Sequence, residues 1–172
     1  MSKTVLLTLG RLPKALALAR ALHSAGYRVV IAEPFRWHVC KPSRSVSACY
    51  RVPAPSVSPA AYLEALLHIV RYEAVDLVVP VSEEALYVAE LHGRLPPEVT
   101  LLCPPPGLLS ELHDKLTFAR RAEALALPVP ATYPAGTAAA RELAGSTHHV
   151  IKPARGCSGI GLELRPAGTP PP

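Results

Sequence analysis

Long hydrophobic runs are missing from this 172-residue sequence, and charged residues are few. No apolar stretch approaches the roughly 18 residues of a membrane-spanning helix, and the apolar residues before Gly10 are too few for a secretion signal. Charged residues make up 18% of the chain and apolar residues 49%, which excludes a disordered polyelectrolyte and a charged coiled coil. We therefore expect a globular, cytoplasmic protein with no membrane partner.

Metal-binding cysteine patterns are also missing. The four cysteines, Cys40, Cys49, Cys103 and Cys157, form no CxxC pair and no Cys/His cluster at the spacing of a structural zinc site, so they are predicted to be reduced thiols. Lys and Arg total 18 against 13 Asp and Glu, which gives a net charge of +5. This excess is too small for a dedicated nucleic-acid-binding protein. We expect small anions, and not nucleic acid, as partners.

The sequence lacks the glycine fingerprint of dinucleotide-binding proteins. The first predicted strand is followed by Gly10-Arg11-Leu12-Pro13, which has no second or third glycine at the GxGxxG spacing. Glu33 is followed directly by Pro34 and does not match the acidic residue of that motif. An NAD-dependent oxidoreductase therefore ranks last among the possible functions. Arg11 at this turn either holds an anion beside a helix N-terminus or is simply solvated.

Strand and helix patterns alternate along the first hundred residues. Short, continuous apolar runs predict buried strands, and amphipathic segments that begin at Pro or Ser predict helices. The expected strands are 4–9, 27–32, 48–52, 76–80 and 99–103, and the expected helices are 13–25, 58–70 and 82–91. This alternation predicts an α/β fold with an open, Rossmann-like, mostly parallel sheet and right-handed crossovers.

The pattern changes after the three prolines at 104–106, where we place a domain boundary that separates residues 1–104 from residues 105–172. The second part is predicted to contain helices 108–113, 114–127 and 137–143, with Asp114 as an N-cap, and two strands, 149–152 and 162–165, joined by a glycine-containing loop. Such a hairpin has no second sheet face to pack against. We therefore expect this part to be incomplete and less well ordered, and the chain to be a fragment.

Two charged segments of the first part could bind a ligand, but each also has a purely structural explanation. Glu83 and Glu84 lie at the start of a predicted helix, where capping explains them better than substrate binding does. The segment 36–51 contains Arg36, Lys41, Arg44 and Arg51 with no acidic residue, and Trp37 and Tyr50 lie among them. We expect a solvated loop, although an acidic ligand could be attracted to it.

A lysine followed by glycines is the sharpest chemical signal in the sequence. Lys152 ends a predicted strand just before a loop that contains Arg155, Gly156, Ser158, Gly159 and Gly161. Glycines allow backbone N–H groups to approach anionic oxygens, and serine and lysine add a donor and a charge, which favours phosphate binding. The order differs from a Walker A loop, because the lysine precedes the glycines. A plain glycine-rich hairpin with a solvated lysine fits the spacing equally well.

These motifs, taken in order, resemble the opening of an ATP-grasp domain. The matching features are Asp114-Lys115 with Phe118 downstream, the LPVPAT segment at 127–132, the VIKP segment at 150–153, and the loop that ends in SGIG at 158–161. The preceding hundred residues are similar to the Rossmann-like pre-ATP-grasp domain of ligases related to carbamoyl-phosphate synthetase and biotin carboxylase. The resemblance covers nearly the whole chain and only the N-terminal portion of such a ligase.

The resemblance implies an ATP-dependent ligase that activates a small carboxylate as an acyl phosphate for attack by an amine or similar nucleophile. It implies that Lys115 and Lys152 contact the phosphates of ATP, and that the loop containing Arg155, Gly156, Ser158, Gly159 and Gly161 folds over them. It also implies Mg²⁺, whose acidic and Asn ligands belong to a second half of the domain that this chain does not contain. No catalytic residue or metal ligand is assigned within the chain.

The alternative interpretation is a non-catalytic α/β module, or a truncated product without activity of its own. It rests on the absence of the second half of the ATP-grasp active site from the sequence. The two interpretations predict the same fold for residues 1–104 and differ in whether the glycine loop binds a nucleotide.

Overall fold

A computed structural model of the chain describes residues 2–171. The chain divides into two compact units, Met1–Leu109 and Ser110–Pro172, and the division falls within helix α4 (Pro106–His113), just after the proline-rich segment. No helix among residues 2–171 combines the length and the apolar character needed to cross a bilayer.

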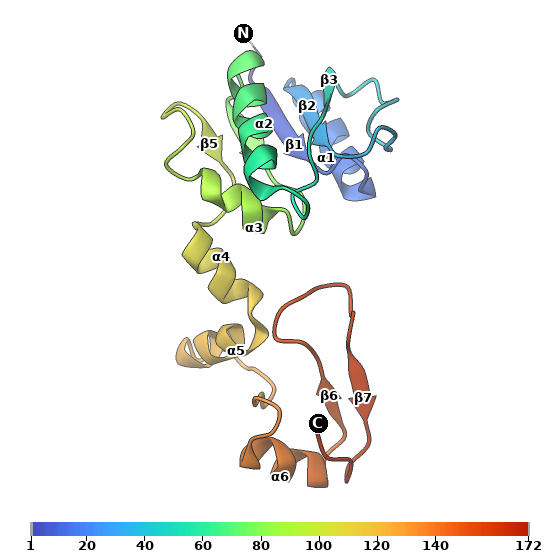
Figure 1. The fold of residues 1–172 in the computed structure, drawn as a ribbon, viewed down its shortest axis with the longest axis vertical. Helices are drawn as coiled ribbons and strands as arrows, with labels where there is room; N and C mark the ends of the chain where they lie inside the picture. Colours follow the sequence, from blue (N-terminus) through green and yellow to red (C-terminus); the bar gives the residue numbers. More distant parts are fainter. Residues whose placement is uncertain (1, 172) are drawn as a thin grey trace. The chain divides into compact units, whose positions relative to one another are not determined.

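The first unit is built on a five-stranded parallel sheet (Figure 1). Its strands are β1 (Thr4–Thr8), β2 (Arg28–Glu33), β3 (Ala48–Arg51), β4 (Leu77–Val79) and β5 (Thr100–Leu101), in the spatial order β3-β2-β1-β4-β5. The predicted open α/β sheet is thus confirmed. Because β2 and β4 flank β1 on opposite sides, the strand order reverses at β1, and the carboxyl ends of β1 and β4 form the edge where open α/β sheets bind ligands.

Helices cover both faces of this sheet. Side chains of successive strand residues point to opposite faces, so Leu6 and Val30 belong to one apolar cluster, and Val5 and Val29 to the other. The first cluster packs against helix α2 (Pro59–Tyr72) through its buried leucines and valine, and the second against helix α1 (Pro13–Ser24) through Ala15 and Ala19. Strands buried on both faces explain why the sequence runs are continuously apolar.

One predicted helix of this unit is wrong in form. The segment 82–91 is not one helix but a short α3 (Ala85–Val88) followed by a 3₁₀ turn, η1 (Ala89–Leu91). The cause is Glu84, whose buried carboxylate accepts hydrogen bonds from the backbone nitrogens of Val81 at 2.7 Å and Ser82 at 3.1 Å. These bonds fold residues 81–84 into a tight turn, so the helix begins only at Ala85.

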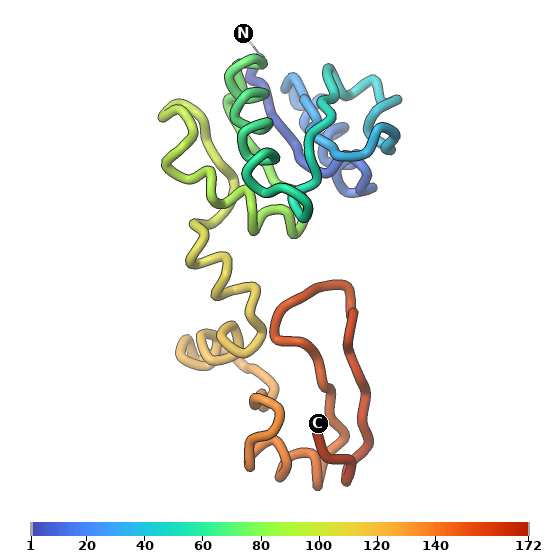
Figure 2. The backbone as a smooth tube through the Cα atoms, viewed as in Figure 1, coloured from blue at the N-terminus to red at the C-terminus, as the bar shows by residue number. Residues whose placement is uncertain are grey.

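The second unit contains the rest of α4, helices α5 (Lys115–Ala124) and α6 (Ala138–Ser146), and an antiparallel hairpin of β6 (His149–Ile151) and β7 (Glu163–Arg165). Figure 2 shows the long loop that joins the two strands. Helix α5 ends at Ala124, three residues before the predicted end at Leu127. Among the described residues of this unit, only Ala122 and Ala144 are buried apolar side chains, whereas Ile160 and Leu164 are largely exposed.

Candidate functional site

The N-terminus of α5 is closed by Asp114. Its Oδ1 accepts hydrogen bonds from the backbone nitrogens of Leu116 at 3.1 Å and Thr117 at 3.0 Å, which confirms the predicted N-cap. The hydrogen bond from the Thr117 backbone, more than any other contact, lowers the pKa of Asp114 below its ordinary value. Because the Asp114 carboxylate already accepts hydrogen bonds from these N–H groups, they are not available to an external anion.

Lys115 ties the glycine loop to this helix. Its Nζ donates a hydrogen bond to the carbonyl oxygen of Gly156 at 2.8 Å, and its backbone nitrogen donates to the carbonyl oxygen of Ala154 at 2.8 Å. Arg155 adds an ion pair, with its Nε 3.4 Å from Oδ2 of Asp114. The fold therefore brings together the Asp-Lys pair and a loop that lies about forty residues later in the sequence.

The loop has a backbone that favours anion contact. Gly156, Ser158, Gly159 and Gly161 all have positive φ angles, between 58° and 122°. In the described part of the chain, the N–H groups of these four residues donate to no other group. At Gly161 a Cβ atom would lie 2.9 Å from Cγ of Pro153, so only glycine fits there without a shift. Successive free N–H groups in such conformations form a concavity that can accept phosphate oxygens.

Lys152 lies directly after β6 and is exposed. Within residues 2–171, no hydrogen bond or ion pair joins it to Lys115 or to the loop. Of the site residues expected from the sequence, Lys115 thus contacts Gly156 and Arg155 contacts Asp114, whereas no contact among the described residues joins Gly159, Gly161 or Lys152 to Lys115. Ser158 is exposed, and its Oγ donates a hydrogen bond to Sγ of Cys157 at 3.3 Å.

This arrangement suits phosphate oxygens and does not by itself suit a divalent metal. Three cationic side chains and four free N–H groups are complementary to an anion. Among the described residues, no group of three or more His, Cys, Asp or Glu side chains could hold a metal ion. The donors of this loop are therefore chemically complementary to the oxygens of a phosphate group.

Arg11, which the sequence left as either an anion site or a solvated side chain, is neither. It is paired with Glu33, whose side chain is fully buried: Oε1 lies 2.7 Å from Nη1 of Arg11, and Oε2 accepts from the Arg11 backbone nitrogen at 3.0 Å. The carboxylate of Glu33 therefore accepts the hydrogen bond of the Arg11 N–H group, at the turn between β1 and α1. Sequence reasoning missed Glu33, because this pairing depends on β2 lying beside β1.

Glu84, which the sequence allowed as a weak substrate-binding candidate, is only 3% exposed and makes the turn contacts already described. Its Oε1 also accepts a hydrogen bond from the Thr8 hydroxyl. These contacts hold the turn before α3, and the Glu84 side chain makes no capping hydrogen bond to α3, so the capping explanation is wrong for Glu84. Nearby, Tyr62 is fully buried, and burial raises the pKa of its hydroxyl well above its ordinary value.

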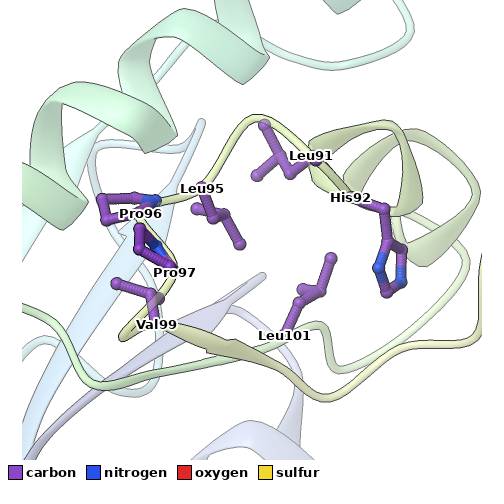
Figure 3. Close-up of a pocket in the computed structure, with 8 residues that line it drawn as sticks. Leu91, His92, Leu95, Pro96, Pro97, Val99 and Leu101 are labelled. Carbon is purple, nitrogen blue, oxygen red and sulfur yellow. The ribbon is translucent and has the colours of Figure 1, made fainter.

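A pocket of about 370 Å³ lies in the first unit beside β5 (Figure 3). Its lining residues are mostly apolar and contain no Lys, Arg, Asp or Glu; they are Leu91, His92, Gly93, Leu95, Pro96, Pro97, Val99 and Leu101. His92 is engaged through its Nε2, 2.8 Å from the carbonyl oxygen of Cys103. A pocket without a charged side chain does not suit a phosphate ligand.

Comparisons with known proteins support the fold. No protein-family model and no curated protein sequence matches the chain. Among solved structures, it is similar to a biotin carboxylase from Campylobacter jejuni (TM-score 0.68, 17% identity, 98% of this chain and 39% of that one). It is also similar to an L-amino acid ligase from Bacillus licheniformis (0.68, 15%, 96% and 39%). A third similar structure is N5-carboxyaminoimidazole ribonucleotide synthetase from Thermotoga maritima (0.64, 15%, 94% and 40%).

These three proteins are ATP-grasp enzymes, and this chain has the fold of their N-terminal portion. The chain spans about two fifths of the length of each. The sequence resemblance to the ATP-grasp superfamily is thus confirmed at the level of the fold, which is what identities of this size can show.

Proposed function

We infer that this chain is the N-terminal portion of an ATP-grasp ligase that activates a small carboxylate with Mg-ATP. The observation that carries this proposal is the attachment of the glycine loop to Lys115 and Asp114, within a fold shared with ATP-grasp carboxylases and ligases. Lysine, arginine and free backbone N–H groups are the donors that suit the oxygens of a polyphosphate, which supports the proposal.

The residues of this chain would bind and orient the phosphates. Lys115 would exchange the Gly156 carbonyl for a phosphate oxygen, because an ammonium group binds the more negative acceptor more strongly. Lys152 would supply a second charge, and the N–H groups of Gly156, Ser158 and Gly159 would donate to the remaining oxygens. Arg155 would break its ion pair with Asp114, and its guanidinium N–H groups would donate to the phosphate oxygens.

When bound, ATP supplies the phosphoryl group that converts the substrate carboxylate into an acyl phosphate. A carboxylate oxygen forms the new bond to the γ-phosphorus as ADP leaves. The lone pair of an amine then attacks the acyl carbon, phosphate leaves with the bonding electrons, and the amine loses a proton. The N–H groups of Gly156, Ser158 and Gly159 and the two lysines would stabilise charge on the transferred phosphate oxygens.

The test is a nuclear magnetic resonance titration of the isotope-labelled chain with Mg-ATP. We expect binding no tighter than about the millimolar range, roughly 4 kcal/mol, because the exposed charges of this site are screened by solvent. The amide signals of residues 115 and 154–161 should shift, whereas adenosine without phosphates should leave them unchanged.

Lys152→Ala should weaken this binding by about 1 kcal/mol or more, the scale of a charge-assisted contact. Lys3→Ala, which removes an exposed lysine from the first unit, is the matched control and should leave it unchanged. If Mg-ATP at about 10 mM shifts no loop amide, the chain is a non-catalytic α/β module and the proposal is wrong.

A further inference from the structure

The first unit carries a cationic, aromatic surface that the proposed function does not use. Residues 34–63 contain no Asp or Glu, although the sequence between them has four Lys or Arg residues: Arg36, Lys41, Arg44 and Arg51. We call the part of this segment formed by Phe35, Arg36, Trp37, Lys41 and Arg51 the cationic loop surface. It follows the carboxyl end of β2, on the side of the sheet where β3 lies (Figure 1).

Cations lie over both exposed aromatic rings of this surface. The guanidinium of Arg36 is 5.5 Å and the ammonium of Lys41 is 4.8 Å from the centroid of the Trp37 ring. Arg11 lies 4.9 Å from the centroid of the Phe35 ring. Cation–π contacts of this kind hold the charged groups in place while leaving their N–H groups available to a partner.

Backbone contacts hold the loop in this arrangement. Lys41 Nζ donates to the carbonyl oxygen of Arg36 at 3.1 Å, and Arg51 Nε donates to that of Pro34 at 3.3 Å. Cys40 anchors the centre of the loop, since its side chain is fully buried and its backbone nitrogen donates to the Gly10 carbonyl at 3.2 Å. A surface fixed in advance loses less entropy on binding.

The same surface exposes large apolar side chains. Trp37 is 74% exposed and Phe35 is 58% exposed, and Val39 between the cations is also exposed. Exposed Trp and Arg side chains that lie together are the residue types that dominate binding energy at protein interfaces. Charge and apolar area therefore coincide on one surface.

We propose that the cationic loop surface binds an acidic polypeptide segment. Carboxylates would pair with Arg36, Lys41 and Arg51, and an aliphatic or aromatic side chain of the partner would pack on the exposed part of Trp37. Carboxylates match the fork of guanidinium donors. Stacking of bare nucleic-acid bases is disfavoured, because a cation already lies over a face of each ring. This proposal does not depend on nucleotide binding by the second unit.

The test uses a fluorescein-labelled oligo-glutamate peptide of about eight residues, titrated with the full chain at low ionic strength and followed by anisotropy. Trp37 is the only tryptophan of the chain, so its emission reports directly whether the peptide reaches this surface. We expect saturable binding with a change in Trp37 emission. The double variant Arg36→Ala, Lys41→Ala should weaken it about tenfold.

The matched control is Lys3→Ala, Arg71→Ala, which removes the same charge from exposed positions before β1 and at the end of α2, at the amino edge of the sheet. It should change the affinity less than about twofold. Equal weakening by both double variants would show that net charge alone is responsible and would overturn the proposal. Tighter binding of an oligothymidine of equal charge, or of phosphatidylglycerol vesicles, would also overturn it.

Discussion

Glu33 accepts two hydrogen bonds from Arg11, one from its backbone nitrogen at 3.0 Å and one from its guanidinium at 2.7 Å. The carboxylate also accepts from the Phe35 backbone nitrogen at 3.0 Å. An internal anion thus takes the place at the first strand-helix turn where dinucleotide-binding folds hold a pyrophosphate. The N–H group of Arg11 at this turn is therefore already paired within the first unit.

Replacing Glu33 by Ala should destabilise the first unit by about 2–3 kcal/mol, since a buried carboxylate that accepts three hydrogen bonds is lost and the N–H groups of Arg11 and Phe35 are left without it. Urea unfolding followed by the emission of Trp37 measures this unit alone. Glu64→Ala is the control, because the pair of Glu64 with Arg94 is exposed and should contribute under about 1 kcal/mol. Equal losses would contradict the structural role given to Glu33.

Lys115→Ala should loosen the glycine loop in the absence of nucleotide. The variant removes the hydrogen bond to Gly156, and a contact of about 1 kcal/mol corresponds to roughly fivefold faster local opening. Limited trypsin digestion reports this opening through the cleavage rate after Arg155, which is exposed.

Lys152→Ala is the control for that digestion. Lys152 has no contact with the loop in the described structure, and the peptide bond after it leads to Pro153, which trypsin does not cut. A faster cleavage in Lys152→Ala than in Lys115→Ala would show that the wrong lysine has been assigned to the loop.

Gly161→Ala and Gly159→Ala separate two effects at the loop. Both glycines have φ near +72°, so each alanine costs about 1 kcal/mol for the left-handed conformation. Only at Gly161 does the added Cβ also meet Pro153, at 2.9 Å, whereas at Gly159 no atom lies within 4 Å. Amide exchange in β6 and β7 should therefore accelerate clearly more in Gly161→Ala. Identical exchange in the two variants would contradict this packing.

The cysteines should react in a fixed order. Burial, with a smaller effect of nearby Cys49, raises the pKa of the Cys40 thiol from 9.0 to about 11, and Cys157 is exposed on the glycine loop. Iodoacetamide at pH 8 should modify Cys157 first and Cys40 last, as mass spectrometry of digests would record. Because folding disfavours the Cys40 thiolate, its contribution to stability is complete below pH 9 and is lost as pH rises toward 11.

Amide exchange should also distinguish the two units. In the first unit, β1 is buried along its whole length, whereas Ala122 and Ala144 are the buried apolar side chains among the described residues of the second. We therefore expect slow exchange in β1 and β2 and fast exchange in β6 and β7. Equally slow exchange in both hairpin strands would show that the second unit has a stability that its small core does not explain.

Local sequence patterns determined most of the secondary structure. The continuous apolar runs at 4–9 and 27–32 predicted strands buried on both faces, and the structure has β1 at Thr4–Thr8 and β2 at Arg28–Glu33. The Asp114 cap was also predictable from the sequence, because its partners, Leu116 and Thr117, lie within one helical turn. Ser58, which directly precedes α2, differs from Asp114 because its side chain makes no capping hydrogen bond.

Only the tertiary structure decided which side chains meet across the sequence. Glu33 pairs with Arg11 because β2 lies beside β1, Glu84 receives the Thr8 hydroxyl because β4 lies on the other side of β1, and Lys115 reaches Gly156 because a hairpin folds back to α5. Local periodicity records which residues are buried and in what kind of element, whereas these pairings depend on strand order and loop closure over long separations. The sequence by itself therefore determined the residue types and the elements that carry them, and the fold decided that Arg11 pairs with Glu33 and that Lys115 contacts the glycine loop.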